Sequence, residues 1–124
     1  MITKNDIERL VAAKFADTGW VEVPAAWLRS GTAQGTPVLK YRKIGTTVHL
    51  YGSLKTTAVM GAGIWNGIID IPFWPQVKRI VPQVNGNYDA CVCSIDTSGN
   101  VEWYNKVQLN TNGSMIFHLS YLSD

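Results

Sequence analysis

The feature that most constrains this chain is a series of short strand-forming segments that begins at residue 17. Segments rich in Val, Ile, Thr and aromatic residues are separated by Gly, Asn and Pro at intervals of about ten residues. No stretch in this region sustains helical periodicity. Successive strands without intervening helices pair antiparallel, so the pattern predicts an all-β antiparallel sandwich or jelly roll of about eight strands.

Two adjacent segments, 38–44 and 47–54, form the clearest predicted hairpin because Gly45-Thr46 separates them. Alternation places Leu39 and Tyr41 together on one face of the first segment. The other predicted strands are 20–23, 69–71, 77–84, 88–95, an interrupted strand comprising 101–104 and 107–109, and 114–122. In the last strand four residues are predicted to be buried on one face: Met115, Phe117, Leu119 and Tyr121.

The N-terminal residues 1–16 have a different pattern from the rest. Asn5 is a candidate helix cap, and Glu8 three positions later completes a pattern similar to a capping box. Three apolar residues follow at helical spacing: Ile7, Leu10 and Val11. We therefore expect an amphipathic helix over about residues 5–14, followed by a β domain over residues 17–124. The helix either packs on its own domain or brings neighbouring chains together.

Composition places the chain among globular proteins and argues against several partners. Of its 124 residues, 46% are hydrophobic and 16% are charged, and the net charge is +2. Without basic clusters, this charge makes nucleic acid a poor candidate ligand. No apolar run approaches the ~18 residues of a membrane span. The first ten residues also lack the pattern of a signal peptide, so we expect no membrane insertion.

The two cysteines, Cys91 and Cys93, are predicted to be small core residues. In a strand, residues i and i+2 point the same way with Cα atoms roughly 6.5–7 Å apart, which is at the limit for a disulfide. A single C-x-C without a nearby His cluster is also a poor zinc site. We therefore expect neither a metal site nor a cofactor.

No residue pattern in the sequence favours an enzyme. His49 and His118 lie off the predicted core face, and no nucleophile motif or phosphate-binding loop accompanies them. Asp89 and Glu102 lie on consecutive predicted strands, and a pair of carboxylates is the requirement for glycoside hydrolysis. Their positions fit solvated strand residues better, so a glycan depolymerase ranks last and no catalytic residue is predicted.

Aromatic residues are the chemically informative feature, with five Trp and five Tyr in the chain. Trp20 and Trp27 are interpreted as packing residues, because Trp is usually largely buried. Several other aromatics adjoin turns and short polar side chains, an arrangement that suits stacking on sugar rings with hydrogen bonds to hydroxyls. It suits protein interfaces equally well. The predicted saccharide-binding residues are Trp65, Asn66, Tyr88, Asp89, Trp103 and Tyr104.

Over residues 17–122 the sequence resembles the receptor-binding head domains of bacteriophage tail fibres and baseplates. The resemblance rests on the opening Asp17-Thr-Gly-Trp20 and on the run Tyr41-Arg-Lys-Ile-Gly-Thr-Thr-Val48, which continues as His49-Leu-Tyr-Gly52. Later elements also fit: Ile69-Asp-Ile-Pro72 with Phe73-Trp-Pro75, Thr97-Ser-Gly-Asn-Val101, and Ser120-Tyr121. These motifs are turn and core signatures, and they specify a fold better than a ligand.

The resemblance implies a homotrimeric head, made in the host cytoplasm and carried at the tip of a phage tail or baseplate. Such heads bind saccharides of the host cell wall or surface and contact other phage tail or baseplate proteins. The expected contacts between copies are made by His49, Tyr51 and Leu10. Family members often carry a long N-terminal shoulder or neck, whereas this chain has a short helix. The alternative is a structural virion subunit, from the baseplate, a fibre or a capsid decoration, that binds only other virion proteins.

Overall fold

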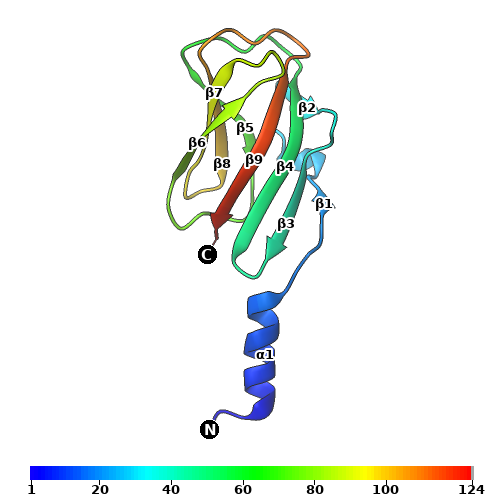
Figure 1. Ribbon diagram of the computed structural model, residues 1–124, viewed down its shortest axis with the longest axis vertical. Coiled ribbons are helices and arrows are strands. Elements are labelled where there is room, and N and C mark those ends of the chain that lie inside the picture. The colour runs from blue at the N-terminus through cyan, green and yellow to red at the C-terminus, as the bar shows by residue number, and fades with distance from the viewer. Residues whose placement is uncertain (124) are drawn as a thin grey trace.

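Two antiparallel sheets face each other and form the body of the protein (Figure 1). The computed structural model describes residues 1–123, except for the side chains of residues 12–15. One sheet has the strand order β1-β3-β4-β2, with β9 also paired to β4, and the other has the order β5-β8-β7-β6. The strands are β1 (Val21–Glu22), β2 (Thr32–Gln34), β3 (Lys40–Ile44), β4 (Thr47–Thr56), β5 (Trp65–Asp70), β6 (Arg79–Val84), β7 (Ala90–Ile95), β8 (Asn100–Asn105) and β9 (Ser114–Leu122).

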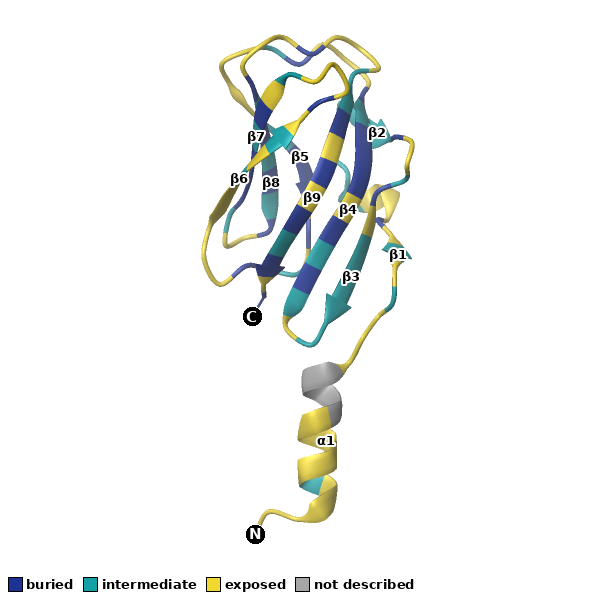
Figure 2. Cartoon of the chain, in the orientation of Figure 1, coloured by how far each residue is buried: buried dark blue, intermediate teal, exposed yellow. Residues whose placement is uncertain are grey.

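The core lies between the sheets and is built by strict alternation along the strands. On β9 the inward residues are Met115, Phe117, Leu119 and Tyr121, as the sequence predicts. Figure 2 shows buried and exposed residues alternating along this strand. The strand pairs with β4 over its full length. The all-β sandwich predicted from the sequence is therefore confirmed.

Helix α1 (Lys4–Phe15) projects beyond the sheets (Figure 1). Its N-cap is Thr3, whose hydroxyl accepts from the Asp6 amide, while the Asp6 carboxylate accepts from the Thr3 amide. The predicted cap Asn5 is wrong, because the capping box of Thr3 and Asp6 starts the helix two residues earlier. A 3-10 helix, η1 (Ala25–Trp27), follows β1. Within residues 1–123, no helix is long and apolar enough to cross a membrane.

Three strand predictions differ from the structure. Strand β5 begins at Trp65, before the predicted start at residue 69, and β2 was not predicted. Neither segment alternates cleanly, because β5 contains a bulge between Gly67 and Ile69 and β2 has only three residues. The predicted segment 107–109 does not continue β8, since Leu109 instead forms an isolated bridge with Met60. In all three places, pairing with segments distant in the sequence determines whether the residues form a strand.

Candidate functional site

The outer face of the four-stranded sheet carries a pair of aromatic rings, exposed Trp65 and half-buried Tyr104, which we call the aromatic platform. Trp65 on β5 lies opposite Tyr104 on β8, with ring centroids 5.3 Å apart and planes inclined by 50°. Trp65 is 44% exposed. The same cross-strand row continues through Val92 on β7 to Pro82 on β6. The register therefore extends the aromatic pair into an apolar row across the sheet.

A charged cluster lies further along β5, with Asp70 five residues from Trp65 and the Arg29 side chain over Gly67. The Arg29 guanidinium donates to both carboxylate oxygens of Asp70, from Nε at 3.0 Å and from Nη2 at 2.8 Å. Gly67 leaves space for this side chain, because an added Cβ would lie 3.2 Å from Arg29 Nη1. The hydrogen bonds to Asp70 raise the pKa of Arg29, and the carboxylates of Glu102 and Asp96 add to this effect. The cluster therefore presents a fixed cation with several carboxylates.

Platform and cluster together offer the contacts that a sugar needs. The flat rings can stack on the C–H face of a pyranose, and carboxylate oxygens accept hydrogen bonds from hydroxyls. Glu102 lies two residues along β8 from Tyr104 and accepts from Asn100 Nδ2 at 3.1 Å. The two rings, Asp70 and Glu102 lie on the paired strands β5 and β8, so the sheet sets their relative positions, and Arg29 is held outside the strands by its bonds to Asp70. Two of the six predicted ligand residues, Trp65 and Tyr104, meet in this arrangement.

The prediction that Trp103 contacts a ligand is wrong. Its side chain is fully buried, packs against Phe117 with ring centroids 5.3 Å apart, and donates from Nε1 to Asn105 Oδ1 at 2.8 Å. Strand β8 runs through this segment, so alternation turns Trp103 inward and Tyr104 outward. The expectation that Trp103 and Tyr104 both adjoin a turn leaves out this alternation between the two faces of the strand.

Three predicted ligand residues lie away from the platform. Tyr88 is 90% exposed on the β6–β7 turn, where Asn85 Oδ1 accepts from the Asp89 amide at 3.0 Å. Strands β5 and β6 are opposite edges of the sheet, so this turn is about three strand spacings, or ~14 Å, from Trp65. Asn66 lines a separate hollow between the loops at residues 30–32 and 58–60. The six predicted residues therefore form no single site.

The two carboxylates weighed for glycoside hydrolysis do not form a pair. Glu102 lies opposite Ser94, which is five residues along the chain from Asp89. At ~3.3 Å per residue this offset is about 16 Å, beyond the ~5–10 Å between the carboxyl groups of glycoside hydrolases. Asp89 and Glu102 therefore belong to different parts of the sheet.

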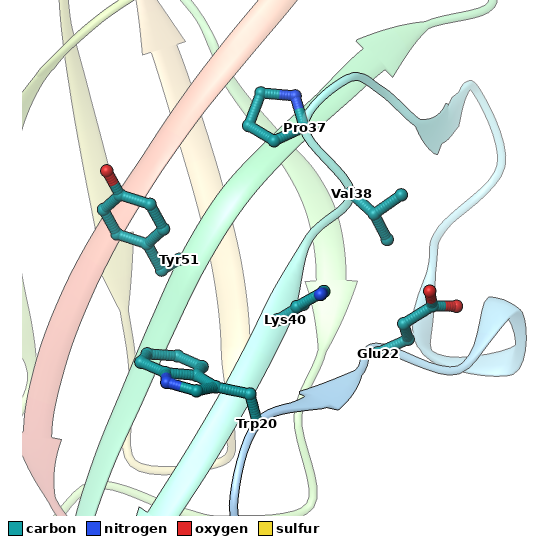
Figure 3. A pocket seen from close by; sticks show the side chains of 6 residues that line it. All are labelled: Trp20, Glu22, Pro37, Val38, Lys40 and Tyr51. Atoms are coloured by element: carbon teal, nitrogen blue, oxygen red, sulfur yellow. The ribbon is translucent and has the colours of Figure 1, made fainter.

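A second candidate surface is a groove of about 500 Å³ on the outer face of the other sheet (Figure 3). Its lining residues are Trp20, Glu22, Pro37, Val38, Lys40 and Tyr51. Trp20 was predicted to be a packing residue, and this prediction is wrong because the side chain is 52% exposed. Trp27 does pack as predicted, against Tyr41 and Phe73 at centroid distances of 5.1 and 5.9 Å. Trp20 and Tyr51 line the same groove, and only the tertiary structure brings them together there.

The predicted position of the histidines off the core face is confirmed. His49 Nδ1 is 2.8 Å from the Ser120 hydroxyl, and the His118 ring contacts Tyr51 edge-on with centroids 5.6 Å apart. Tyr51 is 57% exposed and His49 is half-buried. The assignment of His49, Tyr51 and Leu10 to contacts between copies stays a prediction.

The two cysteines are buried free thiols, as the sequence predicts. Burial raises the pKa of both Cys91 and Cys93, so the thiolate form is disfavoured. Cys91 also donates to Asn105 Oδ1 at 3.2 Å. Among residues 1–123, no three His, Cys, Asp or Glu side chains gather closely enough to hold a metal ion.

Comparison of the sequence with protein-family models and with curated proteins finds no match to either. The aromatic platform with its charged cluster, and the groove at Trp20, are the two surfaces whose chemistry bears on function. They lie on the outer faces of different sheets.

Proposed function

We propose that this protein is the receptor-binding head of a bacteriophage adhesion device and that it binds saccharides of the host surface through the aromatic platform. The observation that carries the proposal is the pairing of exposed Trp65 with half-buried Tyr104, with Glu102 and the Arg29–Asp70 pair further along the sheet. The resemblance of residues 17–122 to phage head domains supports the same function.

The physical argument rests on the exposure of the Trp65 ring and on how firmly the neighbouring side chains are held. An aromatic ring that is half exposed on a strand loses little conformational entropy when it stacks on a ligand, because the sheet already holds it in place. The Arg29–Asp70 pair is bidentate, which fixes the directions of the remaining donors. At this exposure the pair adds little to stability. A role in recognition accounts for its geometry better than a role in folding.

The proposal includes assembly as a homotrimer on the virion tail or baseplate. Single sugar contacts are weak, and linked sites raise the overall avidity by ~10²–10⁴. His49 and Leu10 belong to the proposed contacts between copies. Three chains of 13.7 kDa have a mass of about 41 kDa (3 × 13.7), which light scattering resolves from a monomer.

Binding to an array of bacterial surface glycans tests the ligand assignment. Trp65→Ala should weaken binding at least tenfold, because it removes one of the two stacking rings. Trp74→Ala is the matched control, since Trp74 is 54% exposed and belongs to neither the platform nor the groove. Equal binding by the two variants, or no glycan bound by the native chain, contradicts the proposal.

A second candidate function, a structural virion subunit that binds only virion proteins, is favoured by helix α1. Its apolar residues Ile7, Leu10 and Val11 are exposed and lie on one face. A helix of 12 residues is marginal by itself in water, so this stripe requires a protein partner.

Incorporation into phage particles tests the second candidate. Leu10→Lys places a charge on the stripe and should abolish incorporation, whereas Asn5→Lys on the opposite side of the helix should not. If Leu10→Lys particles lack the protein and the native chain binds no glycan, the structural function replaces the first. Normal incorporation of the Leu10→Lys variant removes the helix as the docking element.

A further inference from the structure

The segment Asp17–Trp20 is folded so that it holds a large aromatic side chain at the surface. Asp17 Oδ1 accepts from the Gly19 amide at 2.8 Å. The Thr18 amide donates to the Lys43 carbonyl at 3.0 Å, and the Lys43 amide donates to the Thr18 hydroxyl at 3.0 Å. These bonds join the segment to strand β3 immediately before Trp20. An exposed tryptophan is therefore fixed in place by its own turn.

Arg42 supports the Trp20 ring. Its guanidinium carbon lies 5.9 Å from the ring centroid, and its Nε donates to Asp17 Oδ1 at 2.9 Å. A cation at this distance from an indole ring is attracted to it. The carboxylate that shapes the turn thus also positions the guanidinium beside the ring. The rest of the ring surface remains free for a ligand.

The groove also contains a second aromatic ring and two charges of opposite sign (Figure 3). One row across the sheet runs from Glu22 on β1 through Lys40 on β3 to Tyr51 on β4. Within the part of the chain that the structure describes, neither Glu22 nor Lys40 has an ion-pair partner. A donor and an acceptor therefore line the same groove as two exposed aromatic side chains.

We propose that this groove is a second saccharide site and that it takes a pyranose ring of a neutral sugar. Trp20 and Tyr51 contact the apolar faces of the sugar, Lys40 donates to a hydroxyl or ring oxygen, and Glu22 accepts from a hydroxyl. The groove volume of about 500 Å³ is in the range of small-molecule sites. Because the two charges are neighbours of opposite sign, a charged ligand would meet one like charge.

The inference rests on the proposed function, since it extends saccharide binding to a second surface, and it assigns Tyr51 to ligand contact instead of contact between copies. The platform and the groove lie on outer faces of different sheets. Each chain would then hold a glycan at two separate points. Linked sites of this kind raise avidity without new contacts at either one.

Titration of the ¹⁵N-labelled full chain followed by NMR tests the proposal, because the five tryptophan indole N–H signals report separate places. The probes are methyl α-glucopyranoside, methyl β-galactopyranoside and N-acetylglucosamine. At least one probe should shift the Trp20 signal and leave the Trp74 signal unmoved. Trp20→Ala should weaken binding at the groove at least tenfold, followed on the Tyr51 signals, while Trp74→Ala should leave it within twofold.

Two further variants test the proposal independently, in case Trp20→Ala perturbs the turn at Asp17–Trp20. Lys40→Met and Glu22→Gln each remove one polar contact and should weaken binding several-fold, with little dependence on salt. Stronger binding of an acidic sugar than of the neutral probes by the native chain overturns the neutral class. Tyr51→Ala should preserve the solution mass, and dissociation of an oligomer by this variant overturns the assignment of Tyr51 to the ligand.

The indole signals also separate this inference from the proposed function. A shift of Trp65 without a shift of Trp20 leaves the platform intact and overturns the groove. A shift of Trp20 without Trp65 supports the groove and contradicts the platform. If no probe moves either signal, the saccharide site in the groove is overturned.

Discussion

The indole N–H of Trp103 donates a 2.8 Å hydrogen bond to Oδ1 of Asn105 in the centre of the core, where both side chains are fully buried. The same oxygen accepts from the Cys91 thiol at 3.2 Å. One amide oxygen thus accepts from the buried indole and from a thiol that also has the Asp89 carbonyl within reach at 3.4 Å. The hydrogen bond lets Trp103, which the sequence predicts at the surface, be buried without leaving its N–H unpaired.

Replacing Asn105 with Ala should lower the free energy of unfolding by about 2–3 kcal/mol. The change leaves the Trp103 N–H buried without an acceptor and opens a small cavity. Urea denaturation followed by tryptophan fluorescence measures the loss. Asn87→Ala is the control, because Asn87 is exposed on a turn and its removal should change stability by less than about 0.5 kcal/mol. Equal losses in both variants would contradict the role of the hydrogen bond.

Gly52→Ala should destabilise the protein by about 3 kcal/mol or more. Gly52 has φ of 137°, and an added Cβ would lie 2.3 Å from the Val38 carbonyl oxygen and 2.5 Å from Leu39 Cα. Both neighbours are backbone atoms of an adjacent segment and cannot rotate away. Gly61→Ala is the matched control, since its nearest neighbour would be a side-chain atom 3.6 Å away. Thermal unfolding of the two variants compares them, and similar midpoints would contradict the close approach at Gly52.

Asp17 should titrate well below an ordinary aspartate. Hydrogen bonds from Arg42 lower the pKa of Asp17 to about 2, with a further contribution from the Gly19 amide. The folded pKa lies below the unfolded value of ~3.9, so the unfolded chain takes up the proton first as the pH falls. The stabilisation is therefore complete above about pH 4 and is lost as the pH falls toward 2.

Carboxyl-carbon NMR measures this titration directly. In the Arg42→Gln variant the midpoint for Asp17 should move up toward ~3.9, whereas Lys40→Gln should leave it low. Because Arg42 also lies beside the Trp20 ring, the Trp20 indole signal should shift over the same pH interval in the native protein. An Asp17 midpoint near 4 in the native protein would contradict the paired geometry.

Neither cysteine should react with a thiol reagent in the folded protein. Cys91 and Cys93 are buried, and burial raises the pKa of each thiol, so little thiolate is present or accessible at pH 8. A chromogenic disulfide reagent should detect no thiol in native buffer and two in denaturant. Rapid reaction of one thiol under native conditions would show that the sheet opens around β7 far more readily than the burial of that strand implies.

Sequence alone predicted the elements whose pattern is local. Strand β9 was predicted with its observed bounds, because its core residues recur at every second position and the turn signal Thr111-Asn-Gly113 precedes it. The β3–β4 hairpin follows for the same reason, since Gly45 closes a short turn between two alternating segments. In these cases each residue's environment depends on neighbours only one or two positions away.

The positions of the tryptophan side chains were harder to predict. A strand turns successive side chains to opposite faces, and a register shift of one residue exchanges the buried and exposed faces. Trp103 was predicted on the surface and is buried, while Trp20 was predicted to pack and is exposed. A tryptophan is compatible with either place, so composition carries no information on which one it occupies. Only the register of each strand against the core decides.

The amino-acid sequence by itself therefore determined the all-β fold class, the N-terminal helix and most strand positions, since these follow from periodicity and turn chemistry. The tertiary structure decided which side chains meet. Arg29 reaches Asp70 across 41 positions of sequence, and Trp20 and Tyr51 line the same groove although they are far apart in the sequence. Such contacts depend on register, on the bulge in β5 and on the missing side chain of Gly67, and no local pattern encodes the distances that result.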